Sequence, residues 1–151
     1  MSDLTVHYSS KTEEWGTPPD FFRDLNEEFH FTLDVCSTHK NAKCAKHYTK
    51  DDDGLAQDWT GETVWCNPPY GREMPKWIQK CAEHAQRGGC AVMLIPARTD
   101  TRAFHDYIYG KAEIRFVRGR LRFVNGDGES VNSAPFPSMV VIFKPITQEG
   151  V

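Results

Sequence analysis

The stretch TVWCNPPY, residues 63–70, decides the fold class of this chain and the chemistry that it can support. Its first half, from Thr63 to Cys66, is mostly apolar and rich in β-branched and aromatic residues, which predicts a strand. The two consecutive prolines cannot continue that strand, and they fix φ in a rigid turn at its carboxyl end. The sequence therefore predicts a strand that ends in a stiff elbow at the edge of a sheet.

The predicted elbow presents two hydrogen-bond acceptors and one aromatic ring. The Asn67 side-chain oxygen and the Pro68 carbonyl can each accept one N–H of an amine, and the rigid turn brings both to one point. An amine on a heteroaromatic ring, such as N6 of adenine, is a poor nucleophile because its lone pair is delocalised into the ring. Catalysis must therefore hold that lone pair in line with the group to be attacked. Tyr70 offers a flat face for a base that has left its stack. Asn67, Pro68, Pro69 and Tyr70 are therefore candidate catalytic residues for methyl transfer, and the alternative is a rigid turn without chemistry.

Strands and helices are predicted to alternate on both sides of the elbow. Thr17 is read as the N-cap of a helix with prolines in its first turn. The predicted helices are 17–28, 74–86 and 101–109, and the predicted strands are 31–35, 47–49, 63–66, 90–95, 113–117 and 139–143, with a hairpin near 125–128. This alternation predicts an α/β fold with a mostly parallel sheet. Asp34, Asn67 and Pro96 fall at predicted strand ends, where such sheets bind ligands, so one cleft built from three loops is expected.

The composition indicates one folded domain. A chain of 151 residues with an apolar fraction of 39% can form a hydrophobic core. Residues 1–13 are expected to be a flexible lead-in, and residues 14–146 a single domain. No segment has the apolar length of a membrane span or signal peptide, and the five cysteines form no CxxC pair, so a cytoplasmic protein with reduced thiols is expected.

Arginines gather in the second half of the chain, although the formal net charge is −3. Arg115, Arg118, Arg120 and Arg122 stand close together, whereas the acidic residues collect within 13–28 and 51–58. The arginines indicate either a phosphate-binding track on an otherwise neutral body or a solvated charged face.

A second set of residues has the spacing of metal ligands. Cys36-x2-His39 and Cys44-x2-His47 supply four soft ligands that zinc would accept. The gap between the two pairs is short for a closed tetrahedral site, and buried cysteines with surface histidines explain the same letters. No metal is therefore expected, and structural zinc stays the alternative.

Motifs throughout the chain resemble those of the phage-type, Dam-like DNA adenine-N6 methyltransferases, a family often carried by phages and prophages. The resemblance covers residues 15–143. It is carried by WGTPP at 15–19, LD at 33–34, DGL at 53–55 with DW at 58–59, NPPYG at 67–71, LIPARTDT at 94–101 and GRLRF at 119–123. The family transfers methyl from S-adenosylmethionine to N6 of adenine in DNA. The resemblance thus implies a Rossmann-like methyltransferase fold with helices on both faces of the sheet, here with a shortened first crossover.

The same resemblance assigns cofactor-binding residues by position. Trp15, Thr17 and Pro18 match the segment that packs against the methionine part of the cofactor. Asp34 would meet its positively charged amino group. The adenine of the cofactor would lie between two residues of the DGL motif, Asp53 and Leu55. No glycine follows the first strand, in contrast to many methyltransferases, so close backbone contacts to the cofactor are not expected from that loop.

The substrate side is also implied by the resemblance. Asn67 and Pro68 would hold the target amine, and Tyr70 would stack on the flipped adenine. Phe136 matches a second aromatic residue that closes over the base. DNA contacts are expected from a short insertion at about 118–137 and from five residues, Arg98, Arg118, Arg120, Arg122 and Phe136.

The expected partner is DNA, without a membrane, and a chain of this size could form a homodimer to gain contact area. Two other functions fit the same motifs. One is methyl transfer to RNA bases or to protein glutamine through the same NPPY site. The other is a non-catalytic nucleic-acid-binding domain of the same fold.

Overall fold

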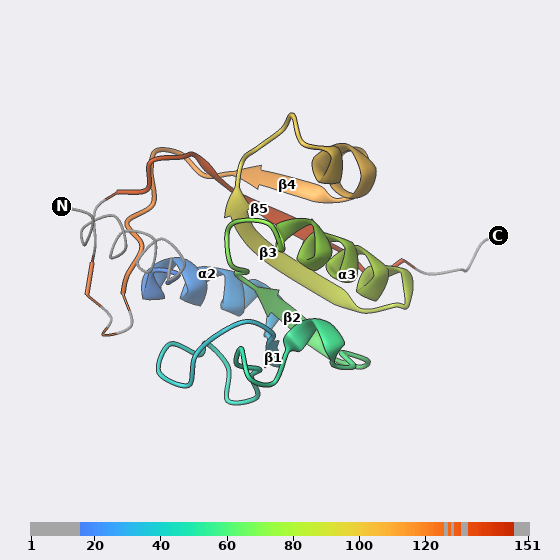
Figure 1. The fold of residues 1–151 in the computed structure, drawn as a ribbon, viewed down its shortest axis with the longest axis horizontal. Helices are drawn as coiled ribbons and strands as arrows, with labels where there is room; N and C mark the ends of the chain where they lie inside the picture. Colours follow the sequence, from blue (N-terminus) through green and yellow to red (C-terminus); the bar gives the residue numbers. More distant parts are fainter. Residues whose placement is uncertain (1–15, 126, 128, 131–132, 147–151) are drawn as a thin grey trace.

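The computed structural model describes residues 16–125, 127, 129–130 and 133–146, in which strands alternate with helices and helical turns (Figure 1). Its elements are α2 (Pro19–Phe29), β1 (Leu33–Asp34), η1 (Gly54–Ala56), β2 (Thr63–Cys66), α3 (Met74–Gln86), β3 (Cys90–Pro96), η2 (Phe104–Ile108), β4 (Glu113–Phe116) and β5 (Ser138–Phe143). The strand before the elbow and the helix after it have the predicted bounds.

The strands form one sheet in the order β1-β2-β3-β5-β4. β1 pairs with β2 and β2 with β3 in parallel, whereas β5 runs antiparallel to both β3 and β4. The expected α/β class is confirmed, and the first half of the sheet is parallel. Because β5 opposes its two neighbours, β4 points the same way as β3. The segment between β4 and β5 therefore begins and ends at the edge where β2 reaches the elbow.

The sheet is covered on both faces, and β3 shows how. Ala91, Met93 and Ile95 belong to the core cluster that contains α3 and η2 residues. The intervening residues, Val92 and Leu94, pack in a second cluster with α2. A strand buried on both faces is apolar throughout, which explains the continuous hydrophobic run that predicted it. The elbow is thus attached to a layer that is fixed from both sides.

Three predicted elements differ from the structure. The strand expected at 31–35 is reduced to the two residues of β1, Leu33–Asp34. The strand expected at 47–49 is reduced to a bridge between His47 and Asp34, with the Tyr48 N–H donating to the Asp34 carbonyl at 2.9 Å. The helix expected at 101–109 becomes the π-helical turn η2, in which the Tyr109 N–H donates to the Phe104 carbonyl five residues earlier. Periodicity in sequence does not distinguish this wider turn from an α-helix.

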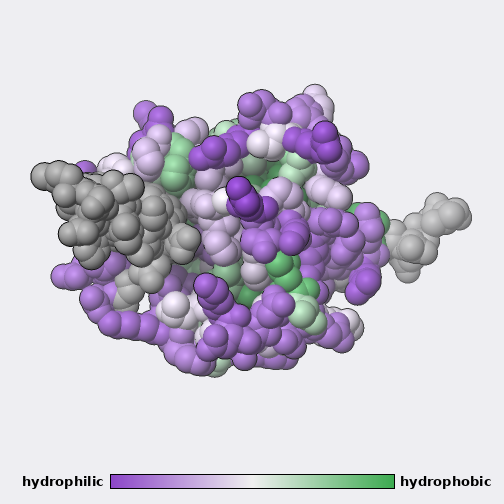
Figure 2. All heavy atoms as spheres, in the orientation of Figure 1, coloured by the Kyte–Doolittle hydropathy of each residue, from purple (hydrophilic) through white to green (hydrophobic). Residues whose placement is uncertain are grey.

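The surface of the face in Figure 2 is mostly hydrophilic, and hydrophobic side chains gather near its centre, below α3. Among the helices of the described residues, none is long and apolar enough to cross a bilayer. The predicted hairpin is present as an antiparallel bridge between Val124 and Ser130, although Gly126 and Gly128 lie outside the described residues.

Candidate active site

A cavity of about 560 Å³ lies at the carboxyl ends of β1 and β2. The parallel pairing of these strands brings the end of β1 beside the end of β2, so that Asp34 and Asn67 reach the same hollow. Four of the predicted cofactor residues line this cavity, namely Thr17, Asp34, Asp53 and Leu55. Asn67, Pro68 and Pro69 of the elbow complete its wall. Pro18 is not among the lining residues, and Trp15 lies outside the described residues.

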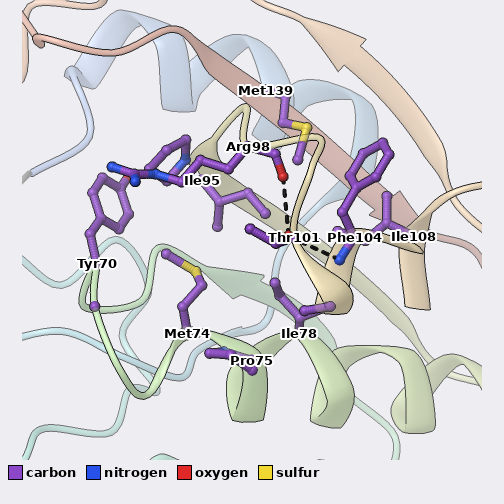
Figure 3. A pocket seen from close by; sticks show the side chains of 13 residues that line it. Tyr70, Met74, Pro75, Ile78, Ile95, Arg98, Thr101, Phe104, Ile108 and Met139 are labelled. Atoms are coloured by element: carbon purple, nitrogen blue, oxygen red, sulfur yellow. Dashed lines mark hydrogen bonds between the residues drawn. The ribbon is translucent and has the colours of Figure 1, made fainter. Parts of the chain in front are cut away.

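A smaller cavity of about 240 Å³ begins at Tyr70 and Gly71, where the elbow continues toward α3. Figure 3 shows Tyr70 and Arg98 at one end, and Ile78, Phe104 and Ile108 at the other. The Thr101 hydroxyl donates to the Arg98 carbonyl at 3.1 Å and accepts the Phe104 N–H at 3.2 Å, which fixes the loop after β3. The elbow therefore separates a larger, more polar cavity from a smaller, mostly apolar one.

The side chain of Asn67 is held at both ends of its carboxamide. Its Nδ2 donates to Thr17 Oγ1 at 3.1 Å, and its Oδ1 accepts the Tyr70 hydroxyl at 2.9 Å. Thr17 was predicted to cap α2 with its side chain, but the cap position is Pro18 and no side-chain cap bond forms. The Thr17 hydroxyl contacts the elbow instead. Its partner, Asn67, lies 50 residues away in sequence, so local cap signals could not reveal the contact.

The ring of Tyr70 is packed between the elbow and the segment that follows β4. Its centroid lies 5.5 Å from that of Phe136 and 6.3 Å from that of Phe123, both edge to face. Burial raises the pKa of Tyr70 far above its usual value, so the hydroxyl stays protonated and can donate. Because Tyr70 and Phe136 are in direct contact, a base has no room between them in this arrangement. The smaller cavity is the side from which the Tyr70 ring can be reached.

Asp34 is a buried carboxylate at the end of β1, with only 2% of its surface exposed. Its Oδ1 accepts the Cys36 N–H at 3.2 Å, and its Oδ2 accepts the Lys43 N–H at 2.9 Å. Burial raises its pKa to about 6, and the two backbone hydrogen bonds act in the opposite direction. Burial therefore makes the Asp34 carboxylate costly to ionise, and a positively charged group bound beside it would offset that cost.

The DGL segment is pressed against the end of β1. Asp53 is exposed and has a left-handed backbone with φ of 55°, and it leads into η1. A Cβ atom on Gly54 would lie 2.1 Å from the Val35 carbonyl oxygen, so a larger residue does not fit there. The close approach explains why glycine stands between the two residues predicted to contact the cofactor.

Two side chains from outside the motif hold the same segment in place. The Lys80 ammonium donates to the carbonyls of Leu55 at 2.9 Å and of Gln57 at 2.6 Å. The Trp59 indole N–H donates to the Gly54 carbonyl at 3.0 Å, and Lys80 lies over the Trp59 ring at 4.8 Å. Sequence reasoning missed Lys80, because a lysine on an amphipathic helix is usually solvated.

A comparison with known families adds to this geometry. The family model for "DNA N-6-adenine-methyltransferase (Dam)" matches residues 5–151. The chain belongs to this family. It is also similar to "Putative methyltransferase YfdM" of Escherichia coli (strain K12), with 38% identity over 65 residues, which cover 38% of this chain and 71% of that protein. The Dam resemblance inferred from the motifs is thereby confirmed.

The glycine-free loop after β1 contributes more to this Dam-family site than its sequence predicts. Cys36, Ser37 and Thr38 all line the larger cavity. Trp77 and Glu73 also line it and were missed. Trp77 belongs to the apolar stripe of α3 that faces the core. Its spacing in the sequence therefore predicts a core residue and does not reveal that it also lines the cavity.

The zinc alternative finds no support in this member of the Dam family. His39 Nδ1 lies 2.9 Å from His47 Nε2, so the two rings contact each other directly. Within the described ranges, no group of three or more His, Cys, Asp or Glu side chains is arranged to hold a metal. Cys36 and Cys44 are partly buried thiols, and burial raises the pKa of Cys44 to about 11.

The arginines of the second half of the chain differ in their contacts. Arg115 binds both carboxylate oxygens of Glu28 at 2.7 Å and one oxygen of Glu113 at 2.6 Å, so it ties α2 to β4. The four arginines that the Dam resemblance assigns to DNA are exposed, and in the described part of the chain none of them forms an ion pair. These four are Arg98, Arg118, Arg120 and Arg122.

Proposed function

We propose that this chain transfers a methyl group from S-adenosylmethionine to N6 of an adenine in DNA, on a Rossmann-like methyltransferase fold with a shortened first crossover. Membership of the Dam family supports the reaction class. The observation that carries the proposal is the position of the NPPY elbow, which stands between a cavity lined by Asp34 and one that begins at Tyr70.

The larger cavity suits the cofactor in size and in chemistry. Its volume of about 560 Å³ lies within the range of small-molecule pockets. The Asp34 carboxylate would hold the α-amino group, because a cation beside it offsets the loss of hydration. Asp53 and Leu55 would hold the adenine end, and Thr17 would lie near the methionine end. When bound, S-adenosylmethionine supplies an electrophilic methyl group on a sulfonium sulfur.

The elbow positions the attacking nitrogen. The Asn67 oxygen and the Pro68 carbonyl accept the two N–H groups of the target amine, which directs its lone pair at the methyl carbon. The nitrogen becomes positive as it gains the methyl group, so the two oxygens stabilise the transition state more than the ground state. Much of the acceleration comes from alignment, and no covalent enzyme intermediate is needed.

The DNA side of the proposal uses the segment between β4 and β5. Arg118, Arg120 and Arg122 would contact phosphates, with Arg98 at the rim of the smaller cavity. The flipped adenine would reach Tyr70 from that cavity, with Phe136 supporting the ring of Tyr70 from another side. The insertion at about 118–137 starts at the edge of the elbow, which supports its assignment to DNA contact.

Incubation of unmethylated DNA with the protein and S-adenosylmethionine, followed by mass spectrometry of the nucleosides, tests the function. We expect new N6-methyl-2′-deoxyadenosine with the native protein and none above background with Asn67→Ala. Cofactor binding by calorimetry should be largely retained in that variant. Parallel reactions with RNA and with protein substrates address the alternative methyl acceptors. Cofactor binding without methylation of any substrate would favour a non-catalytic domain, and equal methylation by the variant would exclude the role of Asn67.

A further inference from the structure

The two ends of the Asn67 carboxamide are chemically different, and the structure gives each end its own partner. The NH₂ group can only donate and the oxygen can only accept. Nδ2 donates to Thr17 Oγ1 at 3.1 Å, and Oδ1 accepts the Tyr70 hydroxyl at 2.9 Å. A carboxamide turned by 180° would present N–H groups where the target amine needs an acceptor. The hydrogen bonds to Thr17 and Tyr70 together therefore hold the carboxamide in the orientation that presents its oxygen.

Both partners are themselves held by other parts of the chain. Thr17 is 2% exposed, and its neighbour Gly16 exchanges two backbone hydrogen bonds with Val124, at 3.0 and 2.9 Å. The Tyr70 hydroxyl shares its single proton between Asn67 Oδ1 and the Leu94 carbonyl on β3, which lies 3.2 Å away. The segment before α2, the segment after β4 and the central strand thus all act on one carboxamide.

We propose that Thr17 is a positioning residue for the methyl transfer, and that it acts by accepting the Asn67 N–H and so keeping the Asn67 oxygen turned toward the target amine. This inference rests on the proposed function for its catalytic consequence. It assigns to the Thr17 hydroxyl a role distinct from cofactor contact. Asn67→Asp should keep a contact with Thr17, because a hydroxyl can donate to a carboxylate oxygen as well as accept from an amide.

Three variants separate this role from cofactor binding. Thr17→Val keeps the shape of the side chain but removes the acceptor, and we expect kcat to fall about tenfold or more while the KM for S-adenosylmethionine changes less than about twofold. Thr17→Ser should restore most of kcat. Thr60→Val, which makes the same change at an exposed threonine outside both cavities, is the matched control and should match the native enzyme.

A double-mutant cycle tests the coupling to position 67. Both ends of the side chain are oxygen in Asn67→Asp, so its orientation no longer matters. Adding Thr17→Val to Asn67→Asp should therefore lower kcat much less than it does in the native background. An equal loss in both backgrounds, or an increase in cofactor KM with kcat unchanged, would overturn the proposal.

Nuclear magnetic resonance of the Asn67 side-chain amide gives a readout that needs no turnover. In the native protein one Asn67 amide proton should exchange with solvent more slowly than those of an exposed asparagine, and Thr17→Val should remove that protection. Fast exchange of the Asn67 amide protons in the native protein would refute the positioning role of Thr17 even if the enzyme is active. Protected amide protons in a protein that methylates nothing would instead refute the proposed function, while the hydrogen bond between Thr17 and Asn67 would stand.

Discussion

The affinity for S-adenosylmethionine should fall as the solution is acidified, in a pH range set by Asp34. This carboxyl is 2% exposed, and burial raises its pKa from 3.8 to about 6, while Lys43 and His47 act in the opposite direction. The folded chain therefore binds a proton here more readily than the unfolded chain, so stability decreases as the pH rises from about 3.8 to about 6 and is level above that. An ammonium group bound beside Asp34 favours the ionised carboxylate, so cofactor binding lowers the pKa of Asp34 and releases its proton.

The size of the effect follows from the pKa of about 6. If the cofactor binds only to the ionised carboxylate, its affinity at pH 5 should be about tenfold lower than at pH 7, or about 1.4 kcal/mol. A carboxyl with the ordinary pKa of 3.8 would leave the affinity nearly constant over the same range. The α-amino group of the cofactor stays protonated throughout, so it adds no pH dependence of its own.

Isothermal titration calorimetry at several pH values measures this dependence directly. Titrations at pH 5 in two buffers of different ionisation enthalpy should also show that close to one proton is released per cofactor bound. Asp34→Asn should bind more weakly at pH 7 and with little change between pH 7 and pH 5. His47→Asn removes an imidazole that lowers the pKa of Asp34, so it should move the pH dependence toward higher pH without abolishing it, in contrast to Asp34→Asn. Constant affinity in the native protein from pH 7 to pH 5 would refute the assignment of Asp34.

Lys80→Met should raise the KM for S-adenosylmethionine several-fold with a smaller effect on kcat, because two loop carbonyls lose their donor while the apolar stem of the side chain remains; an unchanged KM in steady-state kinetics would show that the loop holds its shape without it. Arg115→Gln should lower the free energy of unfolding by about 1 kcal/mol in urea titrations, since its partly exposed ion pairs join α2 to β4, and should leave the salt dependence of DNA binding unchanged. Arg120→Gln should leave the free energy of unfolding unchanged and should reduce the slope of log DNA affinity against log salt by about the amount expected for one phosphate contact. A slope equal to that of the native protein would show that Arg120 does not contact DNA phosphate.

Local sequence signals were sufficient for the elements nearest the elbow. The strand from Thr63 to Cys66 and the helix from Met74 to Gln86 have the expected bounds, because prolines, glycines and apolar periodicity act within a few residues. The π-helical turn η2 was not predicted, since its apolar spacing resembles that of an ordinary helix. The antiparallel direction of β5 was also absent from the prediction, because strand direction depends on the path of the whole chain.

The candidate site was predicted in outline and not in its contacts. The motifs named Thr17, Asp34 and Asn67 separately. The parallel pairing of β1 with β2 brings Asp34 and Asn67 to one cavity, and the segment before α2 adds Thr17. The hydrogen bond between Thr17 and Asn67 joins residues 50 positions apart, and no spacing rule reveals such a pair. The contact between Tyr70 and Phe136 has the same origin, since both residues were identified as aromatic while their edge-to-face packing depends on tertiary structure.

The return of the chain through β5 leaves the segment proposed to contact DNA outside the sheet that carries the elbow. Both ends of the 117–137 segment are anchored in paired neighbouring strands, β4 and β5, and the segment is secured again where Val124 bonds to Gly16. A change of length in a flexible segment held at both ends costs mainly closure entropy, which grows slowly with length. The length of the segment between β4 and β5 can therefore vary with little effect on the strands that position Asn67.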